Sequence, residues 1–342
     1  MIAPIPRRWL TPALLTAAML GVLPARGASG EGGAHPRPQI VEDLYDAHFL
    51  DPAQGWVVGA FGSIYHTADG GRHWRAQKTP STQHLYGVSF ADAERGWAVG
   101  RSGEVLYTHD GGEHWVEQKS GTGKHLFKVC FLDAREGWAV GDWGVVIHTR
   151  DGGVTWEDRS VSEDRVLYAV DFADHENGWM VGESGSIRHT GDGGETWREQ
   201  DSGTRKTFFG VAAVSRERAW VVGIDGLVER TRDGGATWEL QRGARQTADF
   251  EKVRVSELLR SPSLYDVKIR GGKGYIVGDV GNVLVSEDGG ETWARSLLPP
   301  RWRFSWLRGL SVLPSGSGML VGAQGLTFAV EGRSLRFSQA PD

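Results

Sequence analysis

Short apolar runs separated by Gly, Asp and Ser recur along the chain from Leu44 onward. Each run is about four to eight residues long and is rich in Val, Tyr, Phe and Trp, which favours strands over helices. One stretch shows the order: the run 85–90, then 96–100, an apolar run after Gly103, and a turn followed by Trp115. This pattern predicts four short antiparallel strands joined by tight turns.

The four-strand unit occurs seven times, at spacings of 41, 41, 41, 41, 56 and 43 residues. The copies begin at Leu44, Leu85, Leu126, Leu167, Phe208, Leu264 and Leu307. A period of about 40 residues with four strands per copy is typical of a β-propeller blade. A single blade cannot bury both of its faces, so the copies must form one cooperative ring. The sequence therefore predicts an all-β fold, a seven-bladed β-propeller of four-stranded antiparallel blades, over residues 44–339.

The first six copies carry Asp-Gly-Gly-x-x-Trp between the third and fourth strands, which we call the Asp turn. The aspartates are Asp69, Asp110, Asp151, Asp192, Asp233 and Asp288. Each carboxylate can accept backbone N–H groups of its turn, and the glycine pair supplies the positive φ that the turn requires. Catalytic or calcium-binding roles are the alternative, but equivalent residues of different blades lie at least about 10 Å apart. We therefore predict structural roles for these aspartates and no metal site.

Composition narrows the class of protein. The 342 residues include 49 Gly and 15 Trp, and 39% are hydrophobic, which is enough to bury a core. Cys130 is the only cysteine, so an internal disulfide is excluded, and we predict a packing role for it. The formal net charge of −5 gives no global basic excess, which argues against general nucleic-acid or membrane-surface binding.

The first 27 residues have the parts of a secretory signal: Arg7 and Arg8, a short apolar stretch, and small residues up to Gly27. The apolar stretch is short for a membrane span of about 20 residues. We expect cleavage and no stable membrane insertion, with an uncleaved anchor as the alternative. Residues 28–43 are predicted to be a flexible leader or an edge strand. The mature protein is then exported to the periplasm, or to the thylakoid lumen in a phototrophic host.

The paired motifs Gly-Trp-x-Val-Gly and Thr-x-Asp-Gly-Gly-x-x-Trp resemble the photosystem II stability/assembly factor family of β-propellers, which also has bacterial relatives. The resemblance covers residues 44–339, and the pair recurs nearly intact in five blades and in part in a sixth. It implies a non-enzymatic exported factor that binds a client protein. Photosynthetic members bind a reaction-centre precursor through an arginine patch, whose positions do not map onto this sequence residue by residue.

Two long connections on one face of the predicted ring differ from the repeat. They are the insertion 242–263 between blades 5 and 6, which includes Lys252 and Arg260, and residues 299–306 between blades 6 and 7. Both are rich in arginine, and the second contains two tryptophans outside the repeat pattern, a composition typical of an interface. We predict that this surface docks an acidic or aromatic segment of a client. Alternatively, Trp302, Phe304 and Trp306 fill the gap between blades 6 and 7. The predicted partner-binding residues are Arg242, Arg245, Arg254, Arg301, Trp302, Arg303 and Trp306, with Arg101 and Trp143 from neighbouring loops.

Other functions remain as alternatives. A glycoside hydrolase could pair Asp142 with Glu183, or Asp225 with Asp279, as acid and base at about 5 to 10 Å. A glycan- or calcium-binding module is a further alternative. The recurring His66, His148 and His189 lie in different blades, so we expect no shared metal site. We predict no catalytic residue, no cofactor, a protein client rather than nucleic acid, and a monomer.

Overall fold

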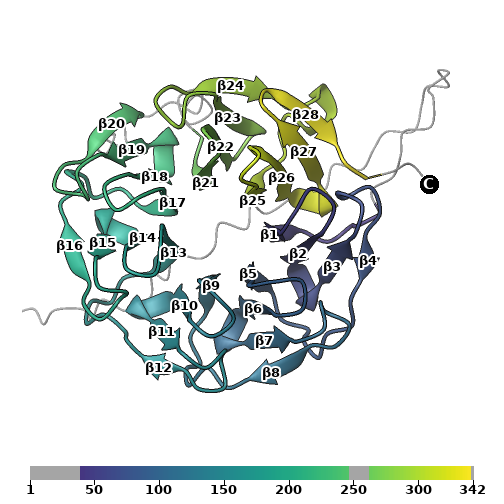
Figure 1. Ribbon diagram of the computed structural model, residues 1–342. Helices are drawn as coiled ribbons and strands as arrows, with labels where there is room; N and C mark the ends of the chain where they lie inside the picture. The colour runs from purple at the N-terminus through teal and green to yellow at the C-terminus, as the bar shows by residue number, and fades with distance from the viewer. Residues whose placement is uncertain (1–38, 246–261, 340–342) are drawn as a thin grey trace, which may run out of the picture. The chain divides into compact units, whose positions relative to one another are not determined.

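The computed structural model describes residues 39–245 and 262–339. The predicted signal 1–27, the leader up to residue 38 and residues 246–261, which include Lys252, Arg254 and Arg260, lie outside the described residues. In the described part, seven four-stranded antiparallel sheets lie side by side around a central axis (Figure 1). The prediction of a seven-bladed β-propeller is therefore confirmed.

Each blade runs from its first strand at the axis to its fourth at the outer edge. The first strands are β1 (Leu44–Phe49), β5 (Leu85–Phe90), β9 (Leu126–Phe131), β13 (Leu167–Phe172), β17 (Phe208–Ala213), β21 (Leu264–Arg270) and β25 (Leu307–Val312). The second strands are β2 (Gly55–Gly59), β6 (Gly96–Gly100), β10 (Gly137–Gly141), β14 (Gly178–Gly182), β18 (Ala219–Gly223), β22 (Lys273–Gly278) and β26 (Ser317–Gly322). The third strands are β3 (Ile64–Thr67), β7 (Val105–Thr108), β11 (Val146–Thr149), β15 (Ile187–Thr190), β19 (Val228–Thr231), β23 (Asn282–Ser286) and β27 (Thr327–Glu331). The fourth strands are β4 (Arg75–Ala76), β8 (Val116–Gln118), β12 (Glu157–Asp158), β16 (Arg198–Gln200), β20 (Glu239–Arg242), β24 (Ala294–Leu297) and β28 (Ser334–Phe337).

The ring closes between the last and first blades without an exchanged strand, because every sheet consists of four consecutive strands. β1 packs beside β25, and the backbone N–H of Phe49 donates to Ser311 Oγ at 2.9 Å. Ile40 is fully buried against blade 7, and residues 39–43 form no strand. The described end of the predicted leader therefore leads into β1 and adds no edge strand.

Large aromatic side chains fill the spaces between blades. Trp56, Trp97 and their counterparts in the second strands are fully buried. The ring of Trp97 stacks on Phe131 of the next blade, with 3.5 Å between centroids, and its Nε1–H donates to the carbonyl of Gly152 at 3.0 Å. Each such tryptophan joins two sheets through apolar contact and thereby makes the stability of one blade depend on the next.

The Asp turns use their aspartates as internal hydrogen-bond acceptors. In blade 4, Asp192 Oδ1 accepts from the Thr190 hydroxyl at 2.7 Å and from the backbone N–H of Thr196 at 2.9 Å. Gly193 and Gly194 have φ values of 68° and 85°, which favour glycine. The hydroxyl and N–H of Thr196 lower the pKa of Asp192 to about 2. The same bonds recur in the other five turns, which supports the structural role predicted for these carboxylates.

A glutamine at the end of the fourth strand links neighbouring blades, an element that we did not predict. Gln241 shows the arrangement: its Oε1 accepts from the Nε1–H groups of Trp220 and Trp293, each at 3.1 Å, and its Nε2 donates to the carbonyl of Gly290 at 2.9 Å. Gln77, Gln118 and Gln200 make the equivalent Nε2 contact in other blades, while the Oε1 atoms of Gln77 and Gln200 each accept from one indole and that of Gln118 from none. We call this contact the glutamine latch.

The latch is missing between blades 3 and 4, where Arg159 occupies the glutamine position. The buried Nε1–H groups of Trp138 and Trp197 have no acceptor there. We expect Arg159→Gln to raise the free energy of unfolding by about 1 kcal/mol, because one buried indole donor, or two as at Gln241, gains a partner. Urea unfolding followed by circular dichroism measures this change.

Arg150→Gln is the matched control, because Arg150 pairs with the same Glu157 and Glu195 as Arg159 but faces no orphaned indole. It should change the free energy of unfolding by less than about 0.5 kcal/mol. Equal stabilities of the two variants would show that the latch adds nothing between these blades.

Candidate functional site

The loops between second and third strands and the connections between blades open on one face of the ring, which we call the connection face. Six of these loops contain a 3-10 turn: η1 (Ala60–Gly62), η2 (Arg101–Gly103), η3 (Asp142–Gly144), η4 (Glu183–Gly185), η5 (Ile224–Gly226) and η7 (Ala323–Gly325). The central residue of every loop has a positive φ, for example 56° at Phe61 and 59° at Trp143. This conformation recurs in all seven loops and is therefore part of the blade structure, and it costs a bulky residue such as Phe61 or Trp143 about 1 kcal/mol or more.

All exposed Phe, Tyr and Trp side chains of the described residues lie on the connection face. Phe61 is 72% exposed, Trp143 55% and Phe304 81%. The most exposed apolar side chain on the Asp turns is the aliphatic Val154. Exposed aromatic residues are enriched in protein interfaces, so this face is the candidate surface for a partner.

The connection between blades 6 and 7 is anchored by Trp302, which belongs to η6 (Pro300–Trp302). Trp302 is half-buried and packs against Phe328 and Phe337 of blade 7, with 5.0 and 4.8 Å between ring centroids. The guanidinium of Arg301 lies 3.5 Å from the centroid of the Trp302 ring. Arg303 and Phe304 project into solvent. Trp302 therefore holds the loop, while its neighbours form the accessible surface.

The remaining predicted docking residues do not gather beside Trp302. Trp306 is half-buried and stacks on Tyr45 of blade 1, with 6.1 Å between centroids. Arg245 turns toward blade 5, where its Nε lies 2.7 Å from Oε1 of the buried Glu229. Arg242 is exposed on β20. The contacts of Arg245 thus separate it from Trp302 and Trp306. Arg101 is exposed in η2, and Arg254 lies outside the described residues.

A cleft of about 500 Å³ lies beside the exposed Trp143. Lys124 Nζ lies 5.9 Å from the centroid of the Trp143 ring. Acidic side chains of the next connection, Glu163 and Asp164, form part of its wall. The cleft therefore combines an aromatic surface with charges of both signs on the connection face.

The carboxylates proposed as acid–base pairs are engaged in local contacts. The backbone N–H of Asp142 donates to the carbonyl of His125 at 2.9 Å, and burial raises the pKa of the Asp142 carboxyl. Glu183 Oε2 accepts the backbone N–H of Val166 at 3.1 Å. Glu183 therefore holds the entry to a first strand through its side chain, which favours a structural role for it.

Asp225 and Asp279, the second suggested acid–base pair, each contact a different neighbouring residue. Asp225 Oδ2 lies 2.9 Å from Lys206 Nζ. Asp279 Oδ2 accepts the hydroxyl of Tyr265 at 2.8 Å, and burial raises the pKa of Asp279. These contacts favour structural roles over catalysis by the pair.

A ring of aromatic side chains surrounds the channel mouth on the connection face. It consists of Tyr45, Tyr86, Phe127, Tyr168, Phe209 and Tyr265, all half-buried. Successive ring centroids are 5.1 to 5.6 Å apart. Arg308 takes the seventh position, with its Cζ 4.9 Å from the centroid of Tyr265 and 5.7 Å from that of Trp306. We call the six rings and Arg308 the aromatic collar.

The collar depends on a β-bulge in each first strand. In β1, Leu44 pairs with Gly59 and Asp46 with Val58, so Tyr45 is left out of the register. The same shift occurs at the second residue of the other six first strands. A bulge redirects the side chain of the extra residue, which explains why seven equivalent residues surround the mouth.

Buried ion pairs cross the channel below the collar. Lys128 of blade 3 extends to Asp46 of blade 1, with its Nζ 2.9 Å from both carboxylate oxygens, and to Asp266 of blade 6 at 3.9 Å. Burial acts to lower the pKa of Lys128, but the two carboxylates outweigh it and raise the pKa. Blade 3 lies across the ring from blade 6 (Figure 1), so the contacts of Lys128 with Asp46 and Asp266 place its ammonium group inside the channel.

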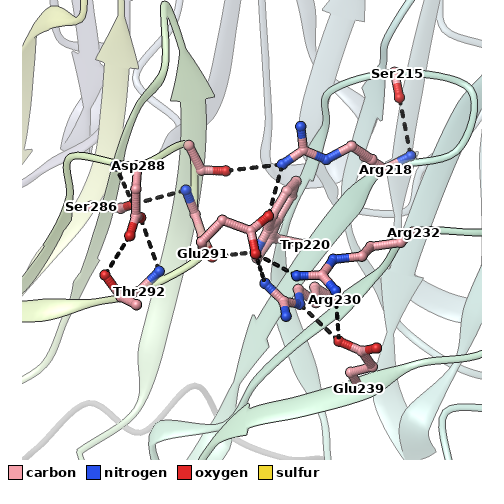
Figure 2. A network of polar contacts seen from close by, with 12 residues as sticks. Ser215, Arg218, Trp220, Arg230, Arg232, Glu239, Ser286, Asp288, Glu291 and Thr292 are labelled. Atoms are coloured by element: carbon pink, nitrogen blue, oxygen red, sulfur yellow. Dashed lines mark hydrogen bonds and ion pairs between the residues drawn. The ribbon is translucent and has the colours of Figure 1, made fainter.

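A network of arginines joins blades 5 and 6 near their Asp turns (Figure 2). Glu291 accepts from Arg218 at 3.2 Å, from Arg230 at 2.6 Å and from Arg232. Burial acts to raise the pKa of Glu291, but Arg232 and Arg230 outweigh it and lower the pKa. The arginines thus connect two blades, a contact between sequence-distant segments that we did not predict.

Comparison with known proteins gives a consistent result. A family model described as photosynthesis system II assembly factor YCF48 matches residues 38–117, 74–165, 155–239 and 197–303. The structure titled YCF48 bound to D1 peptide is 20% identical, with a TM-score of 0.68 over 87% of this chain and 97% of that one. YCF48 from Cyanidioschyzon merolae is also 20% identical, with a TM-score of 0.64 over 84% and 95% of the two chains.

A GH74 xyloglucanase from Xanthomonas campestris shares the fold at 12% identity, with a TM-score of 0.68 over 90% of this chain and 56% of the enzyme. No curated protein matches the sequence. Within residues 39–245 and 262–339, no helix has the length and apolar character of a membrane span. The same residues contain no group of three or more His, Cys, Asp or Glu side chains placed to hold a metal ion.

Proposed function

Because the chain belongs to the photosynthesis system II assembly factor YCF48 family, we propose that it is an exported, non-enzymatic factor that binds a client protein with its connection face. The observation that carries the proposal is the restriction of exposed aromatic residues to this face, with Phe61 and Trp143 held in strained conformations. The solved relative that was captured with a D1 peptide supports a polypeptide ligand. The identity of the client does not follow from that relative.

The loop between blades 6 and 7 is anchored to the ring by one of its tryptophans. Packing of Trp302 against blade 7 fixes the loop, and the guanidinium of Arg301 is held over the tryptophan ring. Arg303 and Phe304 are therefore presented at a lower entropic cost than side chains of a free loop. Their chemistry suits an acidic or aromatic segment of the client.

Export is part of the same proposal, and the signal-like residues 1–27 support it. A client in the periplasm, or in the lumen of a phototrophic host, is then a membrane or exported protein. The ring is proposed to act as a monomer, with the connection face free for the client.

Cross-linked co-purification from host envelopes tests the proposal. We expect tagged wild type to enrich one membrane or exported protein and Arg303→Glu/Phe304→Ser to lose at least about tenfold of it, because central interface residues each contribute strongly to affinity. The control is Arg295→Glu/Val154→Ser, which makes the same kinds of change at exposed residues away from this loop. Equal recovery by all three baits, each verified as folded, would contradict docking at this loop.

A further inference from the structure

The aromatic collar limits what can enter the channel. Seven positions about 5 Å apart describe a circle with a radius of about 6 Å. The half-thickness of the rings leaves an opening of at most about 9 Å. An α-helix with its side chains is about 10 to 12 Å wide and is excluded, whereas an extended segment or a single side chain can enter.

The space inside the collar is closed below, and we call it the pit. Lys128 extends to Asp46 and Asp266, and Lys268 extends to Asp171, so ion pairs between sequence-distant blades occupy the channel below the collar. A polypeptide therefore cannot thread through the ring from this side. The pit accepts only a chain end or one long side chain.

Charge decides which side chain fits. The carboxylates at the pit are Asp43, Asp142, Glu183 and Asp279 at the mouth and Asp46, Asp171 and Asp266 on the floor. The cations are Arg101, Lys124 and Arg308 at the mouth and Lys128 and Lys268 on the floor. The carboxylates outnumber the cations, so the pit has a negative formal charge.

The phenol groups of the collar have raised pKa values, mainly because they are buried and in second place because carboxylates lie near them. Burial and then Asp43 raise the pKa of Tyr45 to about 12. Burial and then Glu183 raise the pKa of Tyr168. Arg308 opposes both increases without cancelling them.

Aromatic faces add to this preference, because their quadrupole attracts cations. Arg308 already illustrates the interaction, since its guanidinium lies over Tyr265 and Trp306. It belongs to blade 7, so the rings of blades 2 to 4 on the other side of the mouth remain available. Those rings lie beside Asp142 and Glu183.

We propose that the pit binds one basic side chain, a lysine or arginine, carried by an extended segment of the client. The inference rests on the proposed function and adds a chemical requirement to it: the client segment presents a cation to the channel mouth. The collar supplies aromatic faces, and the carboxylates of blades 3 and 4 supply the counter-charge.

A peptide series tests the pit directly by calorimetric titration. The probe is acetyl-Gly-Gly-Lys-Gly-Gly-amide, compared with peptides that carry norleucine or glutamate at the central position. We expect the lysine peptide to bind at least about tenfold more tightly than either, because only the ammonium gains both cation–π and ionic contacts. Absence of lysine-peptide binding, or preference for norleucine, would overturn the proposal.

Three variants assign the binding to the pit. Asp142→Asn/Glu183→Gln keeps both hydrogen-bond acceptors and should weaken the lysine peptide by about fivefold or more. Arg308→Met removes the resident cation and should strengthen it severalfold. Glu117→Gln, on the exposed face of β8, should leave the affinity unchanged. Circular dichroism and thermal melting must show that each variant is folded.

Arg308→Met is expected to change the peptide affinity in opposite directions, depending on whether the pit binds a cation or a carboxylate. If Arg308 instead anchors a carboxylate, the glutamate peptide binds best and Arg308→Met abolishes binding, which would overturn the cation site. A failure of the pit proposal can be distinguished from a failure of the proposed function. Client capture without lysine-peptide binding rejects the pit alone, whereas peptide binding without client capture rejects the docking proposal alone.

Discussion

Replacing Trp97 with alanine is expected to lower the free energy of unfolding by about 3–5 kcal/mol, because the change leaves a large cavity between two blades. Trp97 is fully buried, and its ring stacks on Phe131 of the next blade. The variant also leaves the carbonyl of Gly152 without the indole donor. Urea unfolding followed by circular dichroism measures the loss.

Trp143→Ala is the matched control, the same substitution in the next blade. Trp143 is 55% exposed, so its removal should change the free energy of unfolding by less than about 1 kcal/mol. Trp143→Gly should be more stable than Trp143→Ala by up to about 1 kcal/mol, because glycine adopts the observed φ of 59° without strain. A Trp97 variant as stable as the Trp143 variants would contradict the view that second-strand tryptophans couple the blades.

The fold was predictable because the same pattern of residues occurs in seven copies. Tryptophans such as Trp97 recur at a fixed distance from glycine pairs such as Gly111-Gly112, and both positions have one physical purpose in every copy. Strand type, blade number and Asp turns follow from that periodicity. The glutamine latch recurs as well, at Gln77 and Gln118, but a surface glutamine carries no signal until its partners are known.

The aromatic collar was present in the repeat but was not interpreted. Tyr45 and Tyr86 belong to the Leu-Tyr start of a first strand, where strict alternation gives no indication of a redirected residue. The β-bulge at each position turns these side chains toward the axis, and bulges leave little trace in an alternation pattern. Arg308 replaces the aromatic residue in blade 7, and its place beside Tyr265 can be recognised only when the seven residues are seen as a ring.

For the connection between blades 6 and 7, the sequence indicated the segment but not which of its residues are exposed. Its composition drew attention to Trp302 and Phe304, but an irregular segment has no period from which to tell buried from exposed residues. Trp302 packs on Phe337 of blade 7 while Phe304, two residues later, is 81% exposed. The sequence indicated the segment, and the packing of blade 7 decides which of its aromatic residues a partner can contact.

Acid is expected to destabilise the ring steeply between about pH 4 and pH 2. The Asp turn carboxylates have lowered pKa values, about 2 for Asp192, Asp233 and Asp288 against a usual 3.8. Above pH 4 the carboxylate is charged in both states, and its hydrogen bonds stabilise the fold. As the pH falls below 4, the unfolded chain takes up protons first, so this stabilisation is lost as the pH approaches 2.

The six turns act together because each blade packs on the next. These side chains are largely exposed, so solvent screening reduces each contribution to about 0.5–1 kcal/mol. Six such contributions amount to about 3–6 kcal/mol, a large fraction of the stability of a typical domain. Urea midpoints at pH 7, 4, 3 and 2 should therefore fall sharply over the last two steps.

Asp192→Asn isolates one turn. Asparagine retains an oxygen that accepts from the Thr196 N–H, but it loses the charge and cannot titrate. The variant should be less stable than wild type by about 0.5–1 kcal/mol at pH 7, and the difference should shrink toward zero at pH 2. A difference that stays constant across this range would mean that the shape of the side chain, and not its charge, is what the turn requires.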